Sequence, residues 1–323
     1  MSRELVVALS GGIGGAKLAL GLSRIVQPEN LLVVANVGDD FEHLGLRISP
    51  DADTLMYTLA GLDNTKLGWG RRDETWSFME TLASIGGEDW FRLGDRDLAV
   101  HIERTRRLQG GETLSAIAAD FCHRLGVGPR VLPATDDRLR TRLRTDEGWL
   151  DFQDYFVRLQ CRPAVRELHF EGAETARPHP DLLAALRDER LRAVVICPSN
   201  PFISVEPILA VAGMRQALSA CAAPVVAVSP IIGGRAVKGP TAKMMRELGM
   251  TPSAAAVAER YRDLIDGYVM DMEDAEEAAR VRPKATLAQT LMTSLAEREE
   301  LARVVLAAAD AHAYTKGGRD IVA

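Results

Sequence analysis

The feature that most constrains this chain is an apolar run that leads directly into a glycine-rich segment. Residues 5–9 are apolar at every position, and residues 10–17 read Ser-Gly-Gly-Ile-Gly-Gly-Ala-Lys. A strand without a polar face is typical of a parallel sheet covered by helices on both sides. Apolar residues then recur at helical spacing over 16–25, and a second apolar run covers 31–37. This order predicts a βαβ unit with a right-handed crossover.

The same pattern returns in the C-terminal half. Apolar runs at 193–197 and 224–228 each precede a polar or glycine-rich segment, and a further strand is expected at 267–270. Helices are predicted at 51–59, 205–218, 241–248, 253–264 and 295–312.

The middle of the chain follows a different pattern. Helices are expected at 73–85, 98–108 and 112–125, and a β-hairpin over 138–158 carries a row of alternating arginines. Such a row is more often a solvated strand face than a ligand-binding one. We therefore predict an α/β fold with a doubly wound, mostly parallel Rossmann-like sheet. Residues 1–61 and 181–323 would form its nucleotide-binding core, and 62–180 a helical and hairpin insertion.

Composition excludes several classes of protein. The chain has 323 residues, 47% of them hydrophobic, which is enough for a large core, and a net charge of -6, which disfavours nucleic-acid binding. Its four cysteines form no C-x-x-C pair, as expected in a reducing compartment. The run at 5–9 is too short for a signal peptide, and no stretch reaches the roughly 18 apolar residues of a membrane span. We expect a cytoplasmic protein with no membrane or nucleic-acid partner.

The polar motifs follow the predicted strands. Segments 10–17, 38–40, 198–201 and 229–234 each come directly after an apolar run. Because the carboxyl ends of parallel strands meet at one edge of the sheet, these segments should converge, and ligands bind at that edge in open parallel sheets.

The glycine-rich segment favours a diphosphate ligand. Gly11, Gly12, Gly14 and Gly15 would let backbone N–H groups approach phosphate at a helix N-terminus, and Lys17 could add a charge. The segment is not a P-loop, because Ala16 and Leu18 stand where Gly and Ser or Thr belong, and it only half-matches the dinucleotide fingerprint. The structural alternative is a tight turn that needs positive φ.

Four aspartates suggest a magnesium site. Asp39 and Asp40 end the second strand, and Asp51 and Asp53 open the next helix. Mg²⁺ needs only one or two protein carboxylates beside phosphate oxygens and waters. The alternatives are ribose binding by Asp39 and helix capping by Asp51 or Asp53, and the metal role is weaker for Asp51.

One further segment and one lysine each have two possible roles. Residues 94–97 (Gly-Asp-Arg-Asp) could bind a ligand or cap the helix that follows, and Lys238 could reach a phosphate or remain solvated. The sequence contains neither the H-E-x-x-H nor the G-x-S-x-G motif, so nothing supports zincin or nucleophilic hydrolase chemistry.

The motifs, taken in order, carry a family resemblance. They are residues 10–17, 36–40 (Asn-Val-Gly-Asp-Asp), 45–54, 68–70, 74–76, 90–97, 198–201 (Pro-Ser-Asn-Pro) and 229–234 (Ser-Pro-Ile-Ile-Gly-Gly). Because it contains all of these motifs in this order, the chain resembles the 2-phospho-L-lactate transferases of deazaflavin coenzyme F-420 biosynthesis over nearly its whole length.

The resemblance implies a reaction. A guanosine diphospho-acid carries lactate, enolpyruvate or glycerate on its distal phosphate, and the terminal hydroxyl of the deazaflavin alcohol Fo attacks that phosphorus. GMP leaves, Mg²⁺ is required, and the insertion contributes to the acceptor site. Family proteins pair as homodimers. Which acid is transferred, and whether a general base is used, is not decided by the sequence; Asp40 or Asp39 could accept the proton.

The resemblance also assigns residues. Asp39 and Asp53 would hold the metal, with Asp39, Asp40 and Asp53 as the catalytic group. The nucleotide-binding residues would be Gly11, Gly12, Gly14, Gly15, Lys17, Ser199 and Asn200. The acceptor-binding residues would be Asp40, His43, Asp95, Arg96, Asp97, Ser229, Pro230, Ile231 and Gly234.

Two other functions use the same glycine loop. One is a non-catalytic nucleotide-sugar-binding regulator of related fold, and the other is an NAD-dependent oxidoreductase. The paired aspartate segments and the 229–234 motif argue against the regulator, and the imperfect fingerprint argues against the oxidoreductase.

Overall fold

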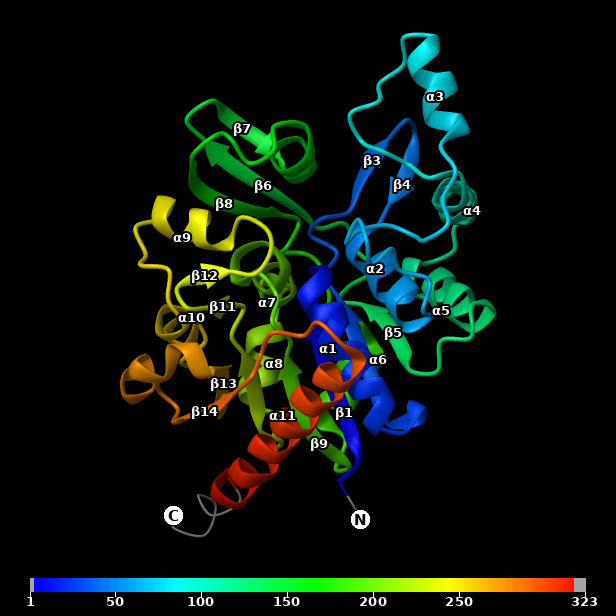
Figure 1. Ribbon diagram of the computed structural model, residues 1–323. Helices are drawn as coiled ribbons and strands as arrows, with labels where there is room; N and C mark the ends of the chain where they lie inside the picture. The colour runs from blue at the N-terminus through cyan, green and yellow to red at the C-terminus, as the bar shows by residue number, and fades with distance from the viewer. Residues whose placement is uncertain (1–2, 317–323) are drawn as a thin grey trace.

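The computed structural model describes residues 3–316, and a seven-stranded sheet runs through its centre (Figure 1). The strand order is β14-β13-β10-β9-β1-β2-β5, and every neighbouring pair is parallel. The strands are β1 (Leu5–Ser10), β2 (Leu31–Ala35), β5 (Arg130–Pro133), β9 (Leu191–Ile196), β10 (Val225–Val228), β13 (Gly267–Asp271) and β14 (Ala285–Ala288). The predicted fold class, a parallel α/β sheet of the doubly wound type, is confirmed.

Helices cover both faces of the sheet, which explains its wholly apolar strands. Alternate residues of β1 belong to two separate cores, with Val7 in one and Val6 in the other. One core contains α1 (Gly12–Ile25), α2 (Pro50–Leu59), α5 (Leu114–Arg124) and α11 (Leu295–Lys316). The other contains α6 (Pro180–Arg187), α7 (Glu206–Ala210), α8 (Met214–Ser219), α9 (Thr241–Glu247) and α10 (Ala254–Arg260).

Several boundaries differ from the sequence expectations. The insertion predicted over 62–180 contributes β5 to the central sheet, because the short segment 130–133 pairs with β2. The helix predicted at 205–218 is divided into α7 and α8, since Gly213 between them adopts a φ of 82°. A π-helical turn (Pro201–Val205) precedes α7, and short 3₁₀ turns occupy Pro28–Asn30 and Met272–Arg280.

Two smaller units stand above the carboxyl edge of the sheet (Figure 1). One combines the hairpin β3 (Phe41–His43) and β4 (Leu46–Ile48) with α3 (Ser77–Ser84) and α4 (Asp95–Gln109) around Ile48, Met79 and Leu93. The other is an antiparallel sheet of β6 (Arg140–Thr145), β7 (Gly148–Asp151) and β8 (Val165–Glu171). A π-helical turn (Asp154–Arg158) lies in the connection between β7 and β8. A β11 (Ile231–Ile232) and β12 (Arg235–Ala236) hairpin follows β10.

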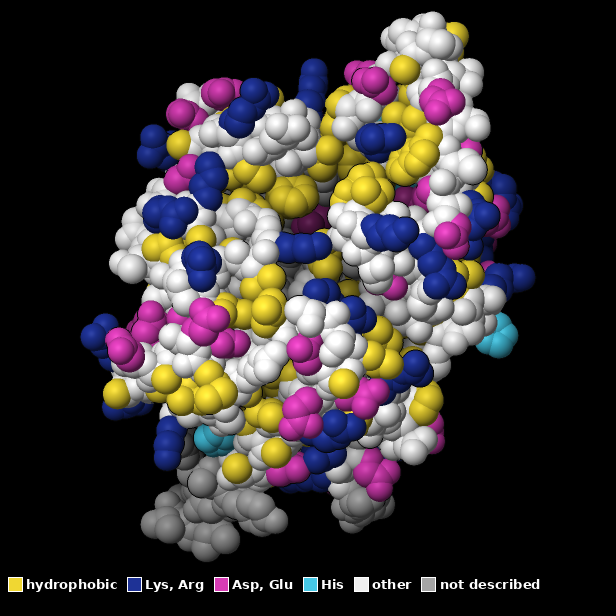
Figure 2. Space-filling view, in the orientation of Figure 1, with side chains coloured by type: hydrophobic (Ala, Val, Ile, Leu, Met, Phe, Trp, Pro, Cys, Tyr) yellow, Lys and Arg dark blue, Asp and Glu magenta, His cyan; other side chains and the backbone are white. Residues whose placement is uncertain are grey.

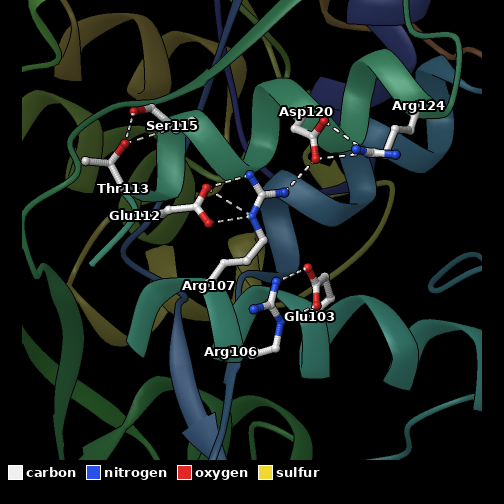
Figure 3. Close-up of polar contacts among 9 residues, drawn as sticks. Glu103, Arg106, Arg107, Glu112, Thr113, Ser115, Asp120 and Arg124 are labelled. Carbon is white, nitrogen blue, oxygen red and sulfur yellow. Dashed lines mark hydrogen bonds and ion pairs between the residues drawn. The ribbon is translucent and has the colours of Figure 1, made fainter. Parts of the chain in front are cut away.

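Ion pairs fix α4 against α5 (Figure 3). Arg107 at the end of α4 donates to Glu112 at 2.6 Å and to Asp120 on α5 at 2.6 Å. Arg124 donates to the same Asp120 at 3.0 Å, and Thr113 caps α5 by accepting from Ala116 N. The end of α4 is thereby anchored to a helix that packs on the central sheet.

The row of arginines over 138–144, on β6 and just before it, is mostly paired with acids of the same small sheet. Arg138 lies 3.6 Å from Glu171, Arg142 2.9 Å from Asp151, and Arg144 3.0 Å from Glu167. Arg140 differs, because it is half-buried and its charge acts on Asp40.

Candidate active site

A cavity of about 630 Å³ opens at the carboxyl edge of the central sheet. Its wall includes residues from the glycine loop, 39–57, 90–101, 152–160, 198–204, 229–241 and 290–292. Figure 2 shows the hollow between the side that carries α9 and β6–β8 and the side that carries α2 and β3–β4. Hydrophobic side chains lie along it and acidic side chains lie deep within it. The predicted convergence of motifs on this edge is therefore seen in the structure.

The glycine loop packs closely against segment 198–204. Ser199 Oγ donates to Gly11 O at 2.7 Å, and a carbon added to Gly11 would lie 2.6 Å from Ser204 Cβ. A carbon added to Gly14 would overlap the carbonyl oxygen of Pro198, and one added to Gly15 would overlap Ser199 Oγ. Close packing within the protein is therefore one reason for these glycines, beside any approach of a phosphate.

Gly12 opens α1 and faces the cavity. Its φ of 63° favours glycine, and its N–H donates to Asp51 Oδ1 at 2.6 Å. Lys17 also lines the cavity, and its Nζ donates to Met292 O at 2.8 Å. The lysine thus ties α1 to the segment that precedes α11.

Asp39 and Asp51 form a buried pair of carboxylates. Asn36 Nδ2 donates to Asp39 Oδ1 at 2.7 Å and to Asp51 Oδ2 at 2.8 Å. Burial and the neighbouring Asp51 raise the pKa of Asp39 well above its usual value, and burial raises the pKa of Asp51 to about 6. Two like charges held together out of water favour a divalent cation as their counter-charge.

Asp40 is buried as well and is not part of the cavity wall. Its Oδ2 accepts from Ser49 Oγ at 2.9 Å, and its Oδ1 has no hydrogen-bond partner among the described residues. Burial raises the pKa of Asp40 to about 7, against the opposing charge of Arg140.

Asp53 lies in a separate buried network. Its Oδ1 accepts from Arg104 Nη2, and its Oδ2 lies 3.7 Å from His101 Nδ1. His101 Nε2 lies 3.3 Å from Asp97 Oδ2, and Tyr57 donates to Asp97 at 2.6 Å. Burial raises the pKa of Asp53 even though Arg104 and His101 oppose the shift.

Two groups of side chains fit a divalent cation by their chemistry. Among the described residues, Asp39 and Asp51 offer carboxylate oxygens without a cationic partner, while Asp53, Asp97 and His101 place three ligand atoms within 4.8 Å of one another. The second group already contains the guanidinium of Arg104, whose charge competes with a metal at Asp53. The structure therefore associates Asp39 with Asp51 more directly than the sequence suggested.

Ser199 and Asn200, expected on the nucleotide side, both line the cavity. Ser199 holds the glycine loop, and Asn200 accepts from Phe202 N at 2.9 Å at the start of the π-helical turn. The side chains thus have structural partners as well as access to the cavity.

The residues expected at the acceptor divide into two groups. Asp97, Ser229 and Pro230 line the cavity. The remaining residues, Asp40, His43, Asp95, Arg96, Ile231 and Gly234, lie outside its wall.

Those outside have other partners. Asp95 accepts from Thr75, Ser77 and Phe78 at the start of α3, and His43 contacts Trp90 edge-on at 4.9 Å between ring centroids. Asp95 thus orders the start of α3, and His43 supports a tryptophan that lines the cavity.

Sequence reasoning gave no role to two sets of residues in or beside the cavity. One set is aromatic, lines the cavity and consists of Trp69, Trp90, Phe91, Phe152 and Phe156. The other consists of the two residues that contact Asp53, namely His101 on the cavity wall and Arg104 outside it. Asp97, His101 and Arg104 recur at helical spacing, so that signal was available in the sequence.

Comparison with known proteins gives consistent matches. Residues 6–309 match the family model of 2-phospho-L-lactate transferase CofD. The chain is 42% identical over 94% of its length to a phosphoenolpyruvate transferase of Kitasatospora aureofaciens, covering 98% of that protein. It is 40% identical over 94% of its length to the phosphoenolpyruvate transferase of Streptomyces coelicolor, covering 98% of it. The Mycobacterium tuberculosis protein of that name is 41% identical over 79% of this chain and 83% of its own.

The fold also has a solved relative. A crystal structure of a UPF0052-family protein, BH3568 of Bacillus halodurans, superposes with a TM-score of 0.62. The sequence identity is 15%, and the match covers 95% of this chain and 99% of that one. At this identity the likeness concerns the fold alone.

Proposed function

This chain belongs to the 2-phospho-L-lactate transferase CofD family, whose members transfer phosphate-containing groups, and on that premise we propose that it makes a coenzyme F-420 precursor. The substrate pair is a guanosine diphospho-acid and the deazaflavin alcohol Fo. The acid is enolpyruvate, because the similar proteins are phosphoenolpyruvate transferases. The products are the phospho-acid ester of Fo and GMP.

One observation carries this proposal. A single cavity joins the glycine loop and the buried carboxylates Asp39, Asp51 and Asp53 to aromatic side chains, among them Trp90 and Phe156. Diphosphate with its metal needs the first set, and a flat tricyclic ring needs the second. The NAD-dependent alternative does not call for several buried carboxylates beside the phosphate loop.

Asp39 with Asp53 is the metal pair that family resemblance favours, and the hydrogen bonds around Asn36 add Asp51 to that set. Bound Mg²⁺ would offset the negative charge of the diphosphate. The glycine loop meets the diphosphate, and Ser199 and Asn200 lie toward the base.

The transfer itself balances simply. The terminal hydroxyl oxygen of Fo forms a bond to the distal phosphorus, and the bond from that phosphorus to the bridging oxygen breaks, so GMP leaves with the electron pair. The hydroxyl proton goes to Asp39 or Asp40; Asp39 lines the cavity, whereas Asp40, with a pKa of about 7, lies outside its wall. Positioning and charge neutralisation supply most of the acceleration.

The test is turnover of purified protein with Fo, Mg²⁺ and three guanosine donors that carry lactate, enolpyruvate or glycerate. The product is identified by mass and GMP is measured in parallel. We expect the enolpyruvate donor to give the highest kcat/KM. Absence of product from all three donors contradicts the proposal, and tighter binding of a UDP-sugar or of NAD than of GDP would favour the regulator or the oxidoreductase.

A further inference from the structure

The cavity has a cationic corner formed by elements other than those that carry its aspartates. Lys17 on α1 and Lys238, which follows β12, both line the cavity. The acids come from the loop after β2, from α2 and from α4. The cavity therefore offers carboxylates to a metal in one part and ammonium groups to an anion in another.

Lys238 reaches across to the insertion. Its ammonium group lies against the backbone of Gly68, because a carbon added to Gly68 would overlap Lys238 Nζ. The next residues of that loop, Trp69 and Gly70, also line the cavity. Lys238 thus places a charge where the core and the loop 68–70 meet.

Lys17 lies beside two other cations. Burial, Arg298 and Lys238 lower the pKa of Lys17, in that order of importance. Asp63 and Glu297 oppose this shift, but Glu297 is occupied at the start of α11, where Thr293 N donates to it at 2.6 Å. Within residues 3–316, Lys17, Lys238 and Arg298 form no ion pair within 4.0 Å, and Arg298 Nε is buried without a hydrogen-bond partner. Lys17 and Lys238, the two of these cations on the cavity wall, thus have no acidic partner among the described residues and are suited to an anionic ligand.

We propose that Lys238, backed by Lys17, binds the carboxylate of the transferred acid and so selects phospho-acid donors over simple nucleotides. This inference rests on the proposed function. Lactate, enolpyruvate and glycerate all carry this carboxylate, whereas GDP lacks it. A metal at the aspartates offsets the charge of the diphosphate, so the additional charge of the acid needs a separate cation. An ammonium–carboxylate contact is a charge-assisted hydrogen bond.

The experiment compares two ligands on one set of variants. Binding of GDP and of the guanosine donor that the wild type turns over is measured by calorimetry, with Mg²⁺ and without Fo. The variants are Lys238→Met, Lys238→Arg and the control Arg235→Met. Arg235 is an exposed cation three positions away that does not line the cavity. A donor analogue with the carboxylate esterified is bound to the wild type in parallel.

We expect Lys238→Met to raise the Kd of the donor roughly tenfold while the Kd of GDP stays unchanged. Lys238→Arg should restore part of the donor affinity, and Arg235→Met should change neither value. The esterified analogue should bind the wild type less tightly than the acid by a similar factor.

Two results would overturn the inference. If Lys238→Met weakens the binding of GDP and of the donor equally, Lys238 binds the diphosphate. If the Kd of the donor is unchanged, Lys238 binds neither the diphosphate nor the carboxylate. Both leave the proposed function intact, since wild-type turnover is measured first. A wild type that turns over no guanosine donor contradicts the proposed function itself.

Discussion

Asp39 and Asp51 accept hydrogen bonds from the same amide nitrogen, Asn36 Nδ2, at 2.7 and 2.8 Å. The two residues are twelve positions apart and come from a loop after β2 and from α2. Asn36 therefore sets the separation of two buried carboxylates, and a divalent cation between them would relieve their repulsion.

Neutralising the paired aspartates should abolish metal-dependent turnover. We expect Asp39→Asn and Asp51→Asn each to lower kcat/KM by more than roughly a hundredfold and to raise the Mg²⁺ concentration for half-maximal rate, because Mg²⁺ relies on one or two carboxylates. Asp53→Asn tests the remaining metal assignment. Asp151→Asn, at an exposed acid on β7, serves as the control. Near-normal Mg²⁺ dependence in both Asp39→Asn and Asp53→Asn would refute that metal pair.

Asp40→Asn should stabilise the metal-free protein at alkaline pH. The pKa of Asp40 is about 7 when folded, against a reference of 3.8, so the folded state favours the protonated form. Stability from this group is therefore full below about pH 4 and is lost as pH rises through 7. We expect the variant to exceed the wild-type Tm by at least about 2 °C near pH 8, with the difference shrinking toward pH 5. Thermal unfolding in EDTA measures the Tm of the wild type and of the variant at each pH. A difference in Tm that does not change with pH would contradict the raised pKa of Asp40.

Arg104→Met should be strongly destabilising. The guanidinium is buried and donates to Asp53, so its removal leaves a buried carboxylate without a cation. We expect a loss of about 3–5 kcal/mol in the free energy of unfolding, measured by urea denaturation. Arg106→Met on the same helix, where the arginine is exposed, should cost less than about 1 kcal/mol. Similar losses in the two variants would mean that the Asp53–Arg104 pair is not a special feature of the fold.

The aromatic side chains should determine acceptor affinity. Phe156 is partly exposed, lines the cavity and stacks on Phe152 at 5.3 Å between ring centroids. Phe156→Ala should raise the Kd of Fo about fivefold or more, since aromatic stacking contributes about 1 kcal/mol, and should leave GDP affinity unchanged. Trp149→Ala, at an exposed aromatic on β7 outside the cavity wall, is the matched control. Unchanged Fo binding in Phe156→Ala would place the ring elsewhere.

Gly14→Ala should lower the free energy of unfolding rather than weaken ligand binding directly. An added carbon would overlap the carbonyl oxygen of Pro198, which belongs to the backbone and cannot move independently. We expect a loss of about 1–3 kcal/mol by thermal or urea unfolding. Gly128→Ala is the control, because its added carbon would lie 3.3 Å from the side chain of Pro28. Wild-type stability with weaker GDP binding would instead show that phosphate contact is the main reason for this glycine.

The sequence alone determined the sheet class and the edge of the sheet at which the cavity opens. Continuous apolar strands with glycine or polar residues after them are local patterns, and they predicted β1, β2, β9, β10 and β13. The strands β5 and β14 were not predicted because neither is a continuous buried apolar run, unlike β10. They lie at the two edges of the sheet, where pairing with a neighbour decides the conformation. The break between α7 and α8 likewise depends on Gly213 within an otherwise helical pattern.

The partners of each aspartate were decided only by the tertiary structure. Spacing along the chain placed Asp39, Asp51 and Asp53 near one edge, but it could not show that Asn36 joins the first two or that Arg104 neutralises the third. Asp51 and Asp53 are two positions apart at the start of α2, and a rotation of about 200° around a helix directs neighbours at that spacing to different surroundings. Charge partners in a folded protein come from elements distant in sequence, so their effects on pKa and metal binding appear only when those elements pack.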